Sequence, residues 1–171
     1  MISAIRGDIT KINDVDVIVN AANKSLLGGS GVDGAIHKAA GKKLLLECLK
    51  LHGCKTGEAK ITKAYNLPVK AIIHTVGPVW KNGHNDEEKA LQQCYYNSLL
   101  LAKKNGYKRI AFPSISTGVY NYPVESAAQT AVSTVIQFLN EYPDSFELIE
   151  WVLFDAVTCR VYESIINRIV G

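Results

Sequence analysis

Two amides and one carboxylate accompany a glycine-dense segment early in the chain. Asn20 and Asn23 precede a run with four of the 13 glycines, from Gly28 to Gly34, and Asp33 lies within it. Glycine lets backbone N–H groups approach a ligand closely and adopts positive φ without steric cost. A helix expected from Gly34 onward would direct its free N–H groups and positive dipole end at this loop. The segment therefore predicts a phosphate-binding loop with reactive side chains beside it.

A second loop has the same character. It runs from Pro113 to Pro123, follows an apolar strand and leads into another expected helix. Its backbone N–H groups and hydroxyls from Ser116 to Tyr120 could form a second anion-binding nest. Two such loops at neighbouring strand ends could hold a pyrophosphate from opposite sides, with Val119 and Tyr120 lying across it.

The first loop also satisfies the dinucleotide-binding pattern G-x-G-x-x-G, from Gly29 to Gly34. In that motif the first glycine directly follows the strand, whereas residues 21–27 separate Asn20 from Gly28 here. A nucleoside-triphosphate P-loop would end in Gly-Lys-Ser/Thr, which is missing. The remaining alternative is a loop that only turns the chain, and the presence of the second loop argues against it.

The elements that would position these loops alternate between strand and helix. Strands are expected up to Arg6 and at 16–20, 59–64, 71–76, 109–112 and 146–154; helices are expected at 34–40, 44–51, 87–105, from Pro123 to before Pro143, and over 161–169. This order predicts an α/β fold, a three-layer α/β/α sandwich with a central mixed, mostly parallel sheet. Ligands of such sheets bind outside the carboxyl ends of the strands, where both loops begin.

Composition narrows the class of protein. With 171 residues, 47% hydrophobic and 20% charged, the chain fits one domain over residues 1–171. The net charge of +3 and the absence of a lysine or arginine block give no sign of a nucleic-acid surface. The chain shows neither a signal peptide nor an apolar run long enough for a membrane span. We therefore expect a cytoplasmic protein that contacts no membrane, and a monomer.

The cysteines and histidines give no metal or disulfide pattern. The four cysteines are dispersed without a C-x-x-C pair, and the four histidines lack the short spacing of metal ligands. Reduced thiols and individual packing or surface roles for the histidines are the expected outcome. We expect no metal and no cofactor.

Four motifs occur in order along the chain: Gly7-Asp8-Ile9-Thr10, Asn20-Ala-Ala-Asn23, Gly28 to Gly41, and Ser116-Thr-Gly-Val-Tyr120. Together they resemble the macro domain family, in its MacroD-type branch, over essentially the full chain. The resemblance implies an ADP-ribose-binding fold. For this branch it implies hydrolysis of mono-ADP-ribosyl esters on protein carboxylates and deacetylation of O-acetyl-ADP-ribose. A non-catalytic ADP-ribose reader is the alternative, and nucleic-acid binding is a third and weaker one.

The resemblance also assigns roles to residues. Asp8, which could equally cap the turn at Thr10, would accept a hydrogen bond from the adenine amino group, with the backbone of Ile9 assisting. Asn23, otherwise a turn former, would orient the distal ribose. Asn20 is expected to support the loop from behind. Phe154, at the end of the last strand, would pack either on adenine or in the core.

Asp33 is the expected general base or water-orienting group, and with Asn23 it forms the expected catalytic pair. The pyrophosphate is expected to bind to backbone groups of Gly31, Val32, Asp33, Gly34, Ala35, Ile36, Ser116, Thr117, Gly118, Val119 and Tyr120. Two residues depart from the family pattern, in which glycine is usual at both places: Ser30 and Asn121. Because asparagine tolerates positive φ, the second change should be mild.

Overall fold

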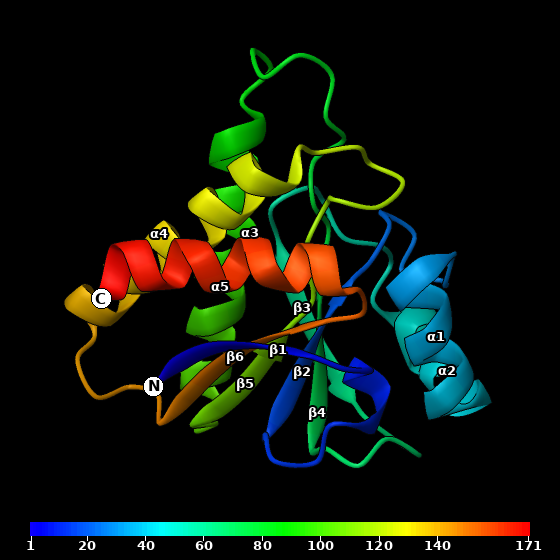
Figure 1. Ribbon diagram of the computed structural model, residues 1–171. Coiled ribbons are helices and arrows are strands. Elements are labelled where there is room, and N and C mark those ends of the chain that lie inside the picture. Colours follow the sequence, from blue (N-terminus) through cyan, green and yellow to red (C-terminus); the bar gives the residue numbers. More distant parts are fainter.

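The core of the molecule is a six-stranded sheet with the strand order β1-β6-β5-β2-β4-β3 (Figure 1). The computed structural model describes all 171 residues, and its strands are β1 (Ile2–Arg6), β2 (Val17–Ala21), β3 (Ala59–Lys63), β4 (Ala71–Thr75), β5 (Arg109–Phe112) and β6 (Leu148–Leu153). Neighbouring strands are parallel except β3 and β4. The mixed, mostly parallel sheet expected from the sequence is confirmed.

The chain has five α-helices: α1 (Gly31–Ala40), α2 (Lys42–Lys50), α3 (Glu87–Lys104) and α4 (Val124–Glu141) lie between strands, and α5 (Ala156–Val170) follows the last one. A short 3-10 helix, η1 (Ile9–Lys11), follows β1. Most bounds agree with the sequence to within two residues, but α1 begins at Gly31 and not at Gly34, with Ser30 as its N-cap. The last helix, α5, begins at Ala156 and not at residue 161, with the Asp155 side chain accepting a hydrogen bond from Thr158 N. Pro123 is the N-cap of α4, one residue before the helix. None of the helices is both long and apolar enough to cross a membrane.

The helices cover the two faces of the sheet, which gives the expected three-layer sandwich (Figure 1). Side chains alternate along each strand, so Val17 and Val19 of β2 pack toward α3, α4 and α5. Ile18 packs on the opposite face, against Ile36 of α1 and Leu44 of α2. The same alternation places Asn20 on the α1 face, where the sheet is buried but no longer wholly apolar.

The strand order brings the two glycine-containing loops together. β5, β2 and β4 are adjacent and parallel, so their carboxyl ends lie at one edge of the sheet. From that edge β2 leads to the loop that ends at Ser30, β5 leads to residues 113–123, and β4 leads to Gly77. The fold therefore concentrates the candidate site residues at one place.

Candidate functional site

A cavity of about 350 Å³ lies between the two loops. This volume falls within the range of small-molecule sites, roughly 300 to 1,000 Å³. Eight of the expected site residues line it: Asn23, Gly31, Val32, Asp33, Ser116, Gly118, Val119 and Tyr120. Ala21, Ala22, Gly29, Ser30, Gly77 and Ser114 complete the lining.

The amino terminus of α1 forms one wall of the cavity. The first N–H groups of a helix have no acceptor within it, and here they belong to Gly31, Val32 and Asp33. The N–H of Gly34 already donates to the Ser30 carbonyl at 3.4 Å, and Ile36 is fully buried in the core below. Gly34, Ala35 and Ile36 therefore do not line this cavity, and their contact with an anion stays a prediction. These three residues lie outside the lining because the helix begins three residues earlier than its apolar pattern suggests.

Asp33 lies in the first turn of α1, and this residue is only 4% exposed. Its Oδ1 accepts a hydrogen bond from Asn20 Nδ2 at 2.9 Å and lies 3.4 Å from His37 Nε2, one helical turn farther along α1. Burial raises the pKa of Asp33, while the Asn20 hydrogen bond and the charge of His37 act in the opposite direction. A raised pKa brings the carboxylate closer to the range in which it can exchange a proton near neutral pH.

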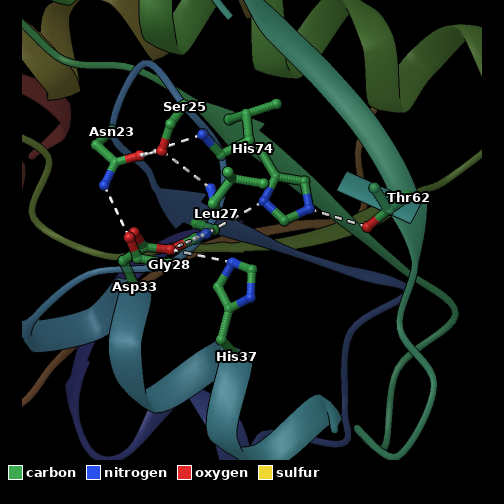
Figure 2. A network of polar contacts seen from close by, with 10 residues as sticks. Asn23, Ser25, Leu27, Gly28, Asp33, His37, Thr62 and His74 are labelled. Atoms are coloured by element: carbon green, nitrogen blue, oxygen red, sulfur yellow. Dashed lines mark hydrogen bonds and ion pairs between the residues drawn. The ribbon is translucent and has the colours of Figure 1, made fainter. Parts of the chain in front are cut away.

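Asn23 also lies in the wall, with both ends of its amide engaged within the loop. Nδ2 donates to the Gly28 carbonyl at 2.8 Å, and Oδ1 accepts from Ser25 Oγ at 2.7 Å and Leu26 N at 3.1 Å. The turn-forming role of Asn23 is thus present in the structure (Figure 2). Contact with a ribose remains a prediction.

The second loop borders the cavity, and two of its residues lie in the left-handed region of backbone conformation. Ser116 and Asn121 have positive φ, at 69° and 60°. Asn121 therefore has the positive φ that asparagine tolerates, which is why we expected its replacement of the usual glycine to have little effect. A Cβ at Gly77 would collide with the side chain of Ser116, so glycine is needed where the segment after β4 passes this loop. The Thr117 hydroxyl donates to Ser114 Oγ at 2.7 Å, and Thr117 does not line the cavity.

The residues expected near adenine lie beyond the cavity lining. Asp8 caps η1, with Oδ1 accepting from Thr10 N at 2.9 Å and Thr10 Oγ1 at 2.7 Å. These bonds lower the pKa of Asp8. The Ile9 side chain is buried in the core, whereas Phe154 is 81% exposed. The core alternative for Phe154 is therefore wrong, and its contact with adenine stays a prediction.

Three polar residues near Asp33 were not singled out in the sequence: His37, His74 and Thr62. Asn20 was expected to support the loop from behind; its Nδ2 instead donates to Asp33 Oδ1 in α1 and also lies 3.1 Å from His74 Nδ1. The i, i+4 spacing of Asp33 and His37 was a usable signal once the helix start was known. No group of three histidine, cysteine or acidic residues is arranged to hold a metal ion.

Comparisons with known proteins agree with this geometry. Residues 19–131 match the family model described as the Macro domain. An O-acetyl-ADP-ribose deacetylase of Escherichia fergusonii is 52% identical, over 98% of this chain and 96% of the relative. A macrodomain of Oceanobacillus iheyensis, solved with ADP, is 46% identical, with a TM-score of 0.91 over 98% of this chain and 90% of that one. A macrodomain of Trypanosoma brucei, solved with ADP-ribose, is 42% identical, with a TM-score of 0.90 over 96% of this chain and 68% of that one.

Proposed function

The chain belongs to the macro domain family, and on this premise we propose that it is a hydrolase that binds ADP-ribose and deacetylates O-acetyl-ADP-ribose. One observation carries the proposal: a buried carboxylate, Asp33, lies in the wall of a cavity whose other groups suit a pyrophosphate. The similar deacetylase and the two macrodomains solved with ADP or ADP-ribose support the same choice of ligand. We extend the proposal to mono-ADP-ribose that is ester-linked to acidic side chains of proteins.

The proposed binding mode uses backbone groups. N–H groups at Gly31, Val32 and Asp33 would bind one side of the pyrophosphate, and those from Ser116 to Tyr120 would bind the other. The distal ribose would then lie near Asn23, with its ester group above Asp33. Holding the substrate in this way supplies the orientation that an attack by water requires.

In the proposed reaction Asp33 accepts a proton from water while that water attacks the ester. The carbonyl carbon and the anomeric carbon of the ribose are both open to attack, and the two routes differ in which product receives the water oxygen. A protonated His37 would stabilise the carboxylate, as its lowering effect on the pKa of Asp33 indicates. A correctly placed general base contributes on the order of 10² to 10⁴ in rate. The mechanism assigned here uses no metal or cofactor.

The test is to give the wild-type protein O-acetyl-ADP-ribose and, separately, a glutamate-ADP-ribosylated protein. Release of acetate and of ADP-ribose is followed, and ADP-ribose affinity is measured by calorimetry on the same preparation. Turnover of both substrates supports the full proposal, and turnover of the first alone restricts it to the small molecule. Binding of ADP-ribose without any turnover would contradict the hydrolase and favour the reader. Mass spectrometry of products formed in H₂¹⁸O distinguishes the two sites of attack.

A further inference from the structure

A row of buried polar side chains runs behind Asp33, across three strands of the sheet (Figure 2). Asn20 on β2 and His74 on β4 are register partners, and both are fully buried. His74 Nε2 lies 2.9 Å from Oγ1 of Thr62, on the edge strand β3, and Thr62 is 3% exposed. Thr62 Oγ1 in turn donates to the Lys63 carbonyl at 3.0 Å. The row thus connects Asp33 to a backbone carbonyl of β3.

Hydrogen-bond chemistry gives this row a direction. An amide nitrogen is only a donor, so Asn20 Nδ2 donates one hydrogen to Asp33 Oδ1 and the other to His74 Nδ1. A neutral imidazole carries one proton, so His74 must then carry it on Nε2 and donate it to Thr62 Oγ1. The Thr62 hydroxyl proton remains free for the Lys63 carbonyl. Every step is consistent with an ionised Asp33 at the end of the row.

The reversed row requires a different protonation state. If the Asn20 amide turned over, its oxygen would face Asp33 Oδ1, which is favourable only when Asp33 is protonated. His74 would then carry its proton on Nδ1, and Thr62 would donate to His74 Nε2. The Thr62 bond to the Lys63 carbonyl would be lost. The orientation of the amide and the charge of Asp33 are therefore linked.

Two features favour the first arrangement. The Lys63 carbonyl offers an acceptor for the Thr62 proton only in that direction. The unpartnered atom of the amide is then Asn20 Oδ1, whereas a reversed amide would leave two buried N–H groups without acceptors. Orphaned buried donors are rarer than under-satisfied carbonyl oxygens. We propose that Thr62 and His74 are positioning residues that orient the Asn20 amide to donate to Asp33 and so keep this base ionised.

Three other titratable groups lie around Asp33, and among the influences that lower its pKa the hydrogen bond from Asn20 is larger than the charge of His37. On α1 the neighbour is His37. On α2 it is Cys48, whose pKa burial raises to about 11. On β4 it is His74, whose pKa is lowered to about 3 by burial and secondarily by His37, so its imidazole is neutral, as the row requires. The value of this support for catalysis rests on the proposed function, but the protonation pattern itself does not.

The first test therefore measures which nitrogen of His74 carries the proton, and it does not depend on turnover. Side-chain ¹⁵N spectra of the wild-type protein distinguish the two imidazole tautomers, and loss of one signal set in His74→Gln assigns them. The expected result is a neutral His74 with its proton on Nε2 at pH 7. A proton on Nδ1 would overturn the proposal, whether or not the protein hydrolyses ADP-ribose esters.

The second test uses Thr62→Val, which keeps the shape of the side chain and removes its hydroxyl. The pKa of Asp33, followed by carboxyl ¹³C titration and assigned with Asp33→Asn, should rise relative to wild type. Hydrolysis below the midpoint of the acid limb should fall roughly three- to tenfold, the effect expected for one hydrogen bond, and recover at higher pH. ADP-ribose affinity should not change.

Thr134→Val is the matched control. Thr134 is a buried threonine on α4 whose hydroxyl also bonds a backbone carbonyl, that of Thr130 at 2.7 Å. It should leave the pKa of Asp33 and the acid limb unchanged. An equal response of the two threonine variants, or no shift in Thr62→Val, would overturn the positioning role. If neither the wild type nor Thr62→Val turns over substrate, but the pKa of Asp33 still rises in Thr62→Val, the proposed function fails and the positioning role stands.

Discussion

Gly29 is the residue that allows the two proposed catalytic side chains to lie close to the same turn. A Cβ at this position would be 3.1 Å from Asp33 Oδ2 and 3.3 Å from Asn23 Nδ2. Both contacts are tighter than ordinary packing, so at least one of the side chains would have to move. The φ of Gly29 is not positive, and the backbone itself can therefore accept alanine. The glycine is required by space and not by conformation.

We expect Gly29→Ala to slow hydrolysis of O-acetyl-ADP-ribose on the order of tenfold or more, because small displacements of a general base are costly. ADP-ribose affinity should fall less than the rate does. Steady-state kinetics with calorimetry measure both quantities. Gly7→Ala is the control, since Gly7 does not line the cavity and a Cβ there would make only an ordinary contact, 3.5 Å from Val152 Cγ1. Equal rates for wild type and Gly29→Ala would show that the spacing of Asp33 and Asn23 does not matter.

The sequence identified Asn23 and Asp33 because both lie in a glycine-dense loop between a strand and a helix. It did not identify His74, which lies within the apolar run Ala71-Ile-Ile-His-Thr75 and becomes informative only when β4 is placed beside β2. Pairing of strands depends on contacts distant in sequence, and local periodicity does not contain them. Polar groups that meet across strands are therefore the part of the site that needs the structure.

At the scale of elements, the connection between β4 and α3 is held by one carboxylate. Glu87 is the first residue of α3, is buried, and accepts hydrogen bonds from the backbone N–H groups of Lys81, Asn82, Gly83 and Asn85, at 2.6 to 3.2 Å. The same connection reaches the second cavity loop, since Trp80 N donates to the Tyr120 carbonyl at 2.8 Å. Glu87 therefore organises a segment that supports the cavity.

The backbone hydrogen bonds, that of Lys81 first, lower the pKa of Glu87 to about 2 from its ordinary 4.5. An acid with a lowered pKa stabilises the folded state fully above its ordinary pKa and loses this effect as the pH falls through the lowered value. We expect Glu87→Gln to lower Tm at pH 7 and to reduce the loss of Tm between pH 4.5 and 2. Thermal unfolding across this range measures it. Glu88 is an exposed neighbour, so Glu88→Gln should change neither the Tm at pH 7 nor its loss between pH 4.5 and 2. Equal behaviour of the two variants would contradict the role of Glu87 in holding this connection.

Most elements were predictable because their apolar periods are regular, but α5 begins at Ala156, five residues before the expected start at residue 161. The start of α1 was also not predicted, since its first turn, Gly31-Val-Asp33, carries no apolar stripe. The 3-10 helix η1 was anticipated only as a turn capped by Asp8. The turn of η1 is capped by the two hydrogen bonds that the Asp8 side chain accepts from Thr10, and a periodic pattern does not reveal such contacts.

At the scale of the whole molecule, two apolar cores on opposite faces of the sheet hold the fold. The three-layer class follows from strands alternating with helices. The antiparallel direction of β3 and the strand order do not follow from it, because they depend on how strands pair. One buried side chain is expected to destabilise the folded state when it is ionised. Glu150 of β6 is 4% exposed, and its Oε1 has no hydrogen-bond partner.

Burial, and secondarily the carboxylate of Asp14, raise the pKa of Glu150 to about 7 against the opposing effect of Arg109. An acid with a raised pKa binds its proton more tightly in the folded state, so stability falls as the pH rises from about 4.5 to about 7. We expect Glu150→Gln to stabilise the protein at pH 8 by on the order of 1 kcal/mol, or roughly 2 to 4 °C in Tm. The gain should be absent at pH 4.

Differential scanning calorimetry at the two pH values measures the effect. Glu58→Gln, which removes an exposed carboxylate, is the control for the change in net charge. A lower Tm for Glu150→Gln at pH 8 would mean that the ionised carboxylate is well solvated or paired in the folded state.

The central claim for the molecule is that its loops bind ADP-ribose through the backbone while Asp33 carries the reaction. The most direct measurement compares wild type with Asp33→Asn, which keeps an acceptor for Asn20 and removes the base. The account predicts that turnover of O-acetyl-ADP-ribose falls on the order of 10² to 10⁴-fold while ADP-ribose still binds with nearly wild-type affinity. Wild-type turnover by Asp33→Asn, with the same affinity, would contradict it.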